Sequence, residues 1–143
     1  MSRIIIDSRE KMPYRFPGAI TRALPAGDYS LDGMEHRVAV ERKTIADCYA
    51  SLGRGRARFE REMERLARMD FAAVVVEATL AEFLRGAPFS RLPPKAAINS
   101  LIAWAVRYRV CVFFAGDRRY ARSLTYRLLE KFARYEGERK RGR

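Results

Sequence analysis

The segment Val38–Lys43, with the sequence VAVERK, constrains the fold of this chain more than any other. Its apolar, β-branched start predicts a buried strand, yet the strand ends in an acid and two cations. Side chains two positions apart on a strand share a face, so Glu41 and Lys43 point together while the valines and Arg42 point to the opposite side. We therefore predict a strand that leaves the core and delivers an acid and a base to one place.

Strands and helices alternate along the chain. A capping box at Thr44 and Asp47 predicts a helix directly after this strand, ending before Gly53. Further helices are expected after Gly55, at Thr79, after Pro94 and from about Asp117. The predicted strands are Arg3–Ile6, Tyr29–Leu31, Arg37–Lys43, Phe71–Glu77 and Val110–Phe114. This order predicts an α/β fold, with α+β as the alternative, in which helices flank a mixed β-sheet.

The hairpin that contains the VAVERK strand carries the predicted chemistry. Asp32-Gly33 is a turn signal, and strand pairing across it would bring Asp28 beside Glu41 and Lys43. Adjacent carboxylates are costly to bury unless a cation lies between them, and their hard oxygens suit Mg²⁺ or Mn²⁺. Such a cation can activate water for phosphodiester hydrolysis. Ordinary solvated charges on an edge strand are the alternative.

The charge of the chain indicates its partner. Among 143 residues, 29 are Lys or Arg and 17 are Asp or Glu, a net charge of +12 with a pI near 10.4. This balance predicts a polyanionic partner, with nucleic acid first and an anionic membrane surface as the alternative. A single His36 and two isolated thiols, Cys48 and Cys111, disfavour histidine-based chemistry, a zinc motif and a disulfide framework.

The length predicts a single domain. We expect it to span residues 1–136 and to be followed by a basic, disordered tail at 137–143. The apolar run Phe71–Val76 is too short to cross a membrane, and the amino terminus lacks the form of a signal peptide. We therefore expect an intracellular, cytoplasmic protein, associated with the nucleoid if it is bacterial.

The candidate residues also form a family pattern. GD at 27–28, ERK at 41–43 and D at 47 together resemble the signature of the XPF-type structure-specific nuclease family. Residues 4–10 resemble the opening strand of that family, and the segments from 51 to 129 resemble its later helices and strands. The resemblance therefore covers nearly the whole chain. It implies the restriction-endonuclease-like fold of the PD-(D/E)XK superfamily, a central mixed β-sheet flanked by helices.

The resemblance also implies roles for individual residues. The implied catalytic residues are Asp28, Glu41 and Lys43. The two carboxylates would bind Mg²⁺ or Mn²⁺, and Asp7 would bind the metal directly or through water. Glu10 would lie at the rim of the same cleft, and Asp47 would hold the helix cap against the site. Taken by themselves, Asp7 and Glu10 are also ordinary polar residues at a strand end, and capping alone explains Asp47.

Arginines near the proposed site are expected to contact phosphates without reading bases. They are Arg9, Arg42, Arg54, Arg56 and Arg58. A solvated helix face is the alternative for any one of them. The resulting hypothesis is a metal-dependent DNA endonuclease acting on branched, flap or single-strand-containing DNA, in repair, in recombination, or in a phage or mobile element. The competing hypotheses are a non-catalytic nucleic-acid-binding subunit with a nuclease-like fold and a small basic RNA-binding protein.

The resemblance finally implies an assembly. Members of this family pair through their nuclease domains, so we expect a homodimer or a partner protein bound through the carboxyl-terminal helices. Trp104 and Tyr108 are candidate contact residues on these helices. Packing in the core explains the same two residues equally well.

Overall fold

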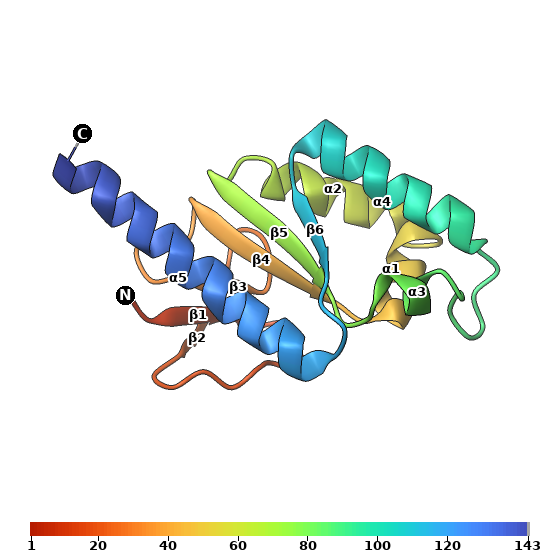
Figure 1. Ribbon diagram of the computed structural model, residues 1–143, viewed down its shortest axis with the longest axis horizontal. Helices are drawn as coiled ribbons and strands as arrows, with labels where there is room; N and C mark the ends of the chain where they lie inside the picture. The colour runs from red at the N-terminus through yellow and green to blue at the C-terminus, as the bar shows by residue number, and fades with distance from the viewer. Residues whose placement is uncertain (143) are drawn as a thin grey trace.

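The computed structural model describes residues 1–142 as a mixed β-sheet with helices on both faces (Figure 1). The strands are β1 (Ile4–Asp7), β2 (Ile20–Arg22), β3 (Tyr29–Leu31), β4 (Val38–Lys43), β5 (Phe71–Val76) and β6 (Cys111–Phe114). The helices are α1 (Ile45–Leu52), α2 (Arg56–Leu66), α3 (Leu80–Phe83), α4 (Pro94–Tyr108) and α5 (Arg118–Gly142). None of these helices combines the length and the apolarity needed to cross a bilayer.

The sheet has six strands in the order β2-β1-β3-β4-β5-β6. β3 runs antiparallel to both β1 and β4, with Tyr29 opposite Ile6 and Val40, whereas β4, β5 and β6 are parallel. Parallel neighbours need a crossover connection, which α1 with α2 and α3 with α4 provide. The predicted α/β fold, a mixed sheet flanked by helices, is confirmed, and the strand that carries ERK lies in its centre.

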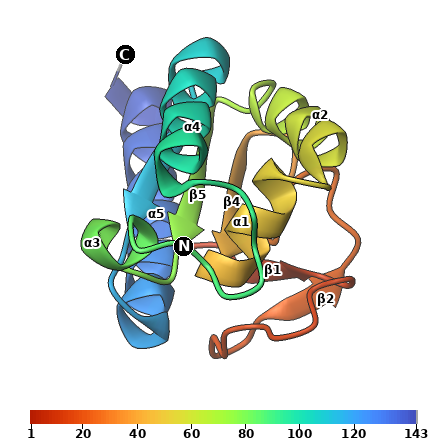
Figure 2. The same cartoon turned by 90° about the vertical axis from the view of Figure 1, so that its right-hand side faces the viewer.

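The alternation of side chains along β4 divides the core into two layers. α1, α2 and α4 cover one face of the sheet, and α5 crosses the other (Figures 1 and 2). Ala39 packs in the first layer, whereas Val38 and Val40 pack in the second with Leu129 of α5. The first three residues of β4 are buried and the last three are partly exposed. The strand therefore leaves the core at its carboxyl end, as predicted.

The helix after β4 begins at the predicted cap. The Thr44 hydroxyl accepts the Asp47 amide at 3.0 Å, and the Asp47 carboxylate accepts the Thr44 amide at 3.5 Å. This pair of bonds satisfies amides that have no partner within the helix. The cap fixes the direction in which the chain turns from β4 into α1, which then ends before Gly53.

Two local features differ from the sequence prediction. β2 is absent from that prediction, because three residues without apolar alternation carry no periodic signal; it forms as an edge strand parallel to β1, with Ile20 opposite Ile5. The connection between β3 and β4 spans residues 32–37, because β4 begins at Val38 and not at the predicted Arg37. Gly33 in this connection has a positive φ of 85°, as its turn signal predicts.

The carboxyl-terminal helix is longer than predicted. α5 continues to Gly142, so the prediction of a disordered tail is wrong for residues 137–142, and Arg143 lies outside the described residues. The buried Glu136 accepts from Arg139 at 2.8 Å and lies 2.9 Å from a nitrogen of Arg37 before β4. These contacts, together with the high helix propensity of Lys, Arg and Glu, extend the helix.

Trp104 and Tyr108 belong to the core side of α4. The Trp104 ring is buried and meets the Phe59 ring edge to face, with 5.7 Å between the centroids. The Tyr108 hydroxyl donates to Glu60 at 2.6 Å. Packing therefore accounts for both residues, and the large apolar side chains that α4 exposes are instead Ile102 and Val106.

Removal of the Leu129 side chain tests the packing of α5. Leu129 is fully buried, so Leu129→Ala should lower the free energy of unfolding by about 2–5 kcal/mol through lost burial and a cavity. Leu84→Ala is the matched control, because this leucine is 43% exposed and should change stability by about 0.5 kcal/mol or less. Urea unfolding measures both. Equal, small losses would show that α5 does not cover the sheet.

Candidate active site

The backbone of β4 holds Asp28 at the start of β3. Gly27 precedes it with a φ of 74°, and a Cβ there would lie 3.0 Å from Ala39 Cβ and 3.2 Å from the Val40 carbonyl oxygen. A side chain at this position would therefore push the two strands apart. The Asp28 amide donates to the Val40 carbonyl at 2.8 Å, and the Asp28 carboxylate accepts the Arg42 amide at 2.7 Å. The carboxylate is thus fixed against β4.

Glu41 and Lys43 leave β4 toward α1 and α2. The Glu41 carboxyl group lies next to that of Asp28, close enough for the two groups to interact directly. The Lys43 ammonium lies 3.6 Å from Glu41 Oε2 and donates to Ser51 Oγ at 2.8 Å. It also lies 4.7 Å from the centroid of the Phe59 ring, a cation–π contact. The structure therefore brings together the two acids and the lysine that the sequence analysis selected.

The two carboxyl groups oppose each other's ionisation. Burial raises the pKa of Asp28 to about 7, although the hydrogen bond from the Arg42 amide acts in the opposite direction. Burial, followed by the negative charge of Asp28, raises the pKa of Glu41 well above its ordinary value, and the Lys43 charge only partly offsets this. Neighbouring buried carboxylates are both ionised at neutral pH only if a positive charge compensates them.

This donor set suits a hard divalent cation that keeps open positions. Within residues 1–142, no three Asp, Glu, His or Cys side chains lie close enough together to hold a metal ion by themselves. A cation between Asp28 and Glu41 would therefore also need oxygen atoms from the backbone, from water or from a substrate. Mg²⁺ is bound in this way in many phosphoryl-transfer sites, by one or two carboxylates and several waters. The residues present fit a catalytic cation of this kind.

Glu41, the outer member of the acidic pair, lines a groove of about 660 Å³ beside α1 and α2, with Asp28 behind it. Glu41, Lys43 and Ser51 are among its lining residues. The cations in its wall are Arg54, Arg58, Arg61 and Arg65. The last three follow one another at helical spacing along α2, so they form a row. A row of guanidinium groups beside two carboxylates can hold a phosphodiester backbone over the acidic pair.

Arg42 and Arg56 do not line this groove, so a phosphate contact by either stays a prediction. Alternation along β4 sends the Arg42 side chain to the α5 face, where its Nε donates to Glu77 at 2.8 Å and a terminal nitrogen lies 3.5 Å from Glu10. This side chain is only 10% exposed, so its guanidinium is engaged within the fold. Arg56 donates to Ser100 of α4 at 2.9 Å. Arg54 and Arg58 are the predicted phosphate contacts that do lie in the groove.

Asp7 lies next to the site, but its carboxylate is engaged in hydrogen bonds at the carboxyl end of β1. Its amide donates to the Asp28 carbonyl at 2.8 Å. Its carboxylate accepts the Leu24 amide at 2.8 Å and two nitrogens of Arg9 at 2.9 and 3.0 Å. Burial alone would raise the pKa of Asp7, but these hydrogen bonds lower it overall. The structure does not gather Asp7 with the other two acids, and a role as metal ligand remains a prediction.

Glu10, Arg9 and Asp47 flank the acidic pair without lining the groove. Besides burial, the negative charge of Glu10 raises the pKa of Asp28 from across the sheet. The Arg9 side chain is 70% exposed beyond its ion pair with Asp7. Asp47 caps α1, which carries Ser51. Supporting roles for Glu10 and Asp47 in the site therefore remain predictions.

Glu62 of α2 is a groove residue that the sequence analysis did not select. Its Oε2 accepts the Gly27 amide at 2.8 Å, and its Oε1 accepts from Arg65 at 2.6 Å. The helical spacing of the apolar residues of α2 assigns Glu62 to the outward face of that helix. The spacing does not show that this face meets the turn before Asp28. Glu62 thereby links the arginine row of α2 to the peptide that positions Asp28.

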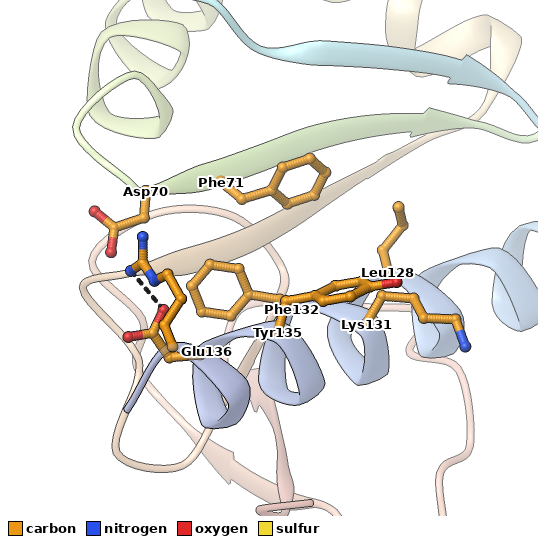
Figure 3. A pocket seen from close by; sticks show the side chains of 8 residues that line it. Asp70, Phe71, Leu128, Lys131, Phe132, Tyr135 and Glu136 are labelled. Carbon is orange, nitrogen blue, oxygen red and sulfur yellow. Dashed lines mark hydrogen bonds and ion pairs between the residues drawn. The ribbon is translucent and has the colours of Figure 1, made fainter. Parts of the chain in front are cut away.

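A second cavity, of about 400 Å³, lies at the other end of the sheet (Figure 3). Phe71, at the start of β5, and Leu128, Phe132 and Tyr135 of α5 form its apolar walls. Phe71 pairs with the first residue of β4, so the length of that strand separates this cavity from Glu41. The acids at its rim are already paired with Arg37. This cavity is therefore not the candidate active site.

This chain belongs to the ERCC4 domain family. The model of that family, described as the ERCC4 domain, matches residues 6–128. The resemblance to XPF-type nucleases is thereby confirmed. A comparison with curated proteins gave no significant match.

Two solved structures share the fold over 96% of this chain. One is XPF from Aeropyrum pernix, with a TM-score of 0.71 and 23% sequence identity, of which this chain covers 68%. The other is XPF from Aeropyrum pernix in complex with DNA, with a TM-score of 0.67 and 24% identity, of which this chain covers 66%. The chain thus spans about two thirds of the length of these structures.

Substitution of Glu62 should weaken metal binding through the Gly27 peptide. Glu62→Ala removes the acceptor of the Gly27 amide, so Asp28 loses part of its support and Mn²⁺ affinity should fall about 10- to 100-fold, as for other residues that orient metal ligands. Glu62→Gln keeps an oxygen at this place and should retain most of the affinity. Titration calorimetry with Mn²⁺, without DNA, measures the effect.

Glu64→Ala is the matched control for this test. It removes the same charge from an exposed position on the same helix, so it should leave Mn²⁺ affinity unchanged. Equal losses for Glu62→Ala and Glu62→Gln would show that the charge, and not the hydrogen bond, matters.

Asp28→Asn should flatten the pH dependence of stability. Because the pKa of Asp28 is raised in the folded protein, folding binds a proton between about pH 4 and pH 7, and the metal-free protein loses stability as the pH rises through this range. Asn cannot ionise, so the variant should melt several degrees above the wild type at pH 8 in EDTA and near it at pH 5. Asp32→Asn, on an exposed turn, is the control. A wild-type slope in Asp28→Asn would contradict the raised pKa.

Proposed function

We propose that this chain is a Mg²⁺- or Mn²⁺-dependent DNA endonuclease that hydrolyses phosphodiester bonds in branched, flap or single-strand-containing DNA. The observation that carries this proposal is the adjacent Asp28–Glu41 pair, with Lys43 beside it, where Glu41 and Lys43 line a groove walled by arginines. Membership of the ERCC4 domain family supports it, as does a shared fold with an XPF structure solved in complex with DNA.

In the proposed mechanism, each residue of the site has its own role. Asp28 and Glu41 would hold the cation, which supplies an activated water and polarises the phosphoryl oxygen when it is bound. Lys43, held by Ser51 and the Phe59 ring, presents its ammonium beside Glu41 and stabilises the negative charge that develops at phosphorus. The arginine row of α2 holds the backbone of the substrate by phosphate contacts, which carry no sequence information.

Two buried carboxyl groups that took part in no reaction would only destabilise the fold. This cost distinguishes the proposed nuclease from a non-catalytic binding subunit. A non-catalytic binding subunit needs the arginine row but not the Asp28–Glu41 pair, whose burial raises both pKa values. An RNA-binding protein would likewise have no use for the pair. The proposed substrate places the protein inside the cell, on the nucleoid in a bacterium, in a repair, recombination or mobile-element pathway.

Pairing of two copies, or binding of a partner protein, belongs to the same proposal. The exposed Ile102 and Val106 lie one helical turn apart on α4 and offer an apolar contact on the carboxyl-terminal half of the chain. Charged side chains flank them, which is the composition expected of a contact surface of moderate size.

Substitution of the acidic pair tests the proposed activity. With labelled flap, fork, duplex and single-stranded DNA, the wild type should nick branched substrates with Mg²⁺ or Mn²⁺ and not with EDTA. Asp28→Ala and Glu41→Ala should lower the cleavage rate at least about 1,000-fold, because metal-borne chemistry supplies most of the barrier reduction, while DNA affinity in EDTA stays within a few-fold of the wild type. Lys43→Ala should lower the rate more than the Mn²⁺ affinity.

Two outcomes would overturn the assignment. Undiminished cleavage by either alanine variant would place the chemistry elsewhere. Tight DNA binding by the wild type with no cleavage under any divalent metal would favour the non-catalytic subunit.

A further inference from the structure

The loop between α3 and α4, residues 84–93, presents an aromatic ring to solvent. Phe89 is 108% exposed, whereas most large aromatic side chains of this protein pack in the two cores. Its φ is +65°, a conformation that a bulky residue with a Cβ rarely adopts. Ala87 and Leu92, on either side, pack against the core and anchor the loop. The ring is therefore held outward by a fixed loop and not by a free chain end.

The surroundings of Phe89 are strongly basic. No Asp or Glu occurs from residue 83 to residue 116. The exposed cations nearest to Phe89 in the sequence are Arg85, Arg91 and Lys95. A hydrophobic ring on a loop that carries cations and no acid is complementary to an anionic chain that carries flat apolar groups. Single-stranded nucleic acid has this composition.

The loop lies on the helix that supports the active site. The Tyr49 hydroxyl of α1 donates to the Phe83 carbonyl at 2.6 Å, and the two rings lie 4.9 Å apart. α1 also carries Ser51, the hydrogen-bond partner of Lys43. Figure 2 shows the loop passing across α1 on the side that faces the viewer. The loop starts from α3, and α3 is thus tied to the helix that carries Ser51.

We propose that Phe89 stacks on an unpaired base, with the loop cations on the flanking phosphates, and so selects DNA that contains a single-stranded segment next to the scissile bond. This inference rests on the proposed function and names a feature of its substrate. Bases inside a duplex are already stacked on their neighbours and offer no free face. An unpaired base offers one whatever its identity, so the contact recognises strand structure without reading sequence.

DNA binding measured without metal tests this contact separately from catalysis. In EDTA, Phe89→Ala should weaken affinity for single-stranded and forked DNA about 10-fold, and should leave affinity for a duplex of equal length unchanged. Phe89→Trp should restore the lost affinity. A 2-aminopurine placed in the single-stranded arm of the fork should lose fluorescence on binding the wild type or Phe89→Trp, and not Phe89→Ala. Tyr135→Ala, which removes an exposed aromatic ring from α5, is the control and should behave as the wild type.

The results separate this inference from the proposed function. Stacking that depends on Phe89, in a chain that cleaves no DNA with any metal, would support the inference and contradict the nuclease. Metal-dependent cleavage with equal fork affinity for wild type and Phe89→Ala would overturn the inference alone. Equal losses on fork and duplex, or a change in oligomeric state of Phe89→Ala in gel filtration, would also overturn it, the latter in favour of a second copy as the occupant.

Discussion

The hydrogen bond from the Arg42 amide to the Asp28 carboxylate, 2.7 Å long, is the contact on which the site depends. It ties the side chain at the start of β3 to the backbone of β4 at the point where β4 leaves the core. The same segment of β4 then aims Glu41 at Asp28, so a backbone contact sets the spacing of the two acids. Backbone geometry in the middle of a sheet varies little, and this keeps an unfavourable pair of carboxyl groups in place.

Side chains alternate along β4, so its two cations lie on opposite faces of the sheet and have different roles. Lys43 faces the groove, where Ser51 and Phe59 hold its ammonium beside Glu41. Arg42 faces the opposite layer, where Glu77 accepts its Nε; burial alone would make an unpaired guanidinium costly there. One cation is thus available for chemistry because the other neutralises the acid at the end of β5. Because these charges are divided between the two faces of the sheet, β4 can carry three consecutive charged residues and still pack in the core.

The parts of the molecule that follow from short-range rules could be predicted from the sequence. The alternation of VAVERK, the capping box at Thr44 and the apolar run of β5 predict the centre of the sheet and its first helix, and the GD and ERK residues predict the acidic pair. β2 has no periodic signal, since only pairing with β1 creates it. Glu62 could not be selected, because its role comes from a contact between residues 35 positions apart in sequence.

The prediction of a disordered tail fails for a related reason. A high density of charge in residues 137–142 favours solvation, but two ion pairs at helical spacing hold this segment in the helix: Arg134 lies 3.7 Å from Glu138, and Arg139 lies 2.8 Å from Glu136. Composition describes how strongly a segment is solvated, whereas spacing decides whether its charges attract or repel one another along a helix. The same distinction applies to α2, where Glu62 interrupts the arginine row. Without that acid the arginines of the row would repel one another and the Gly27 amide would lose its acceptor, so a single carboxylate serves both the basic groove and the acidic pair beside it.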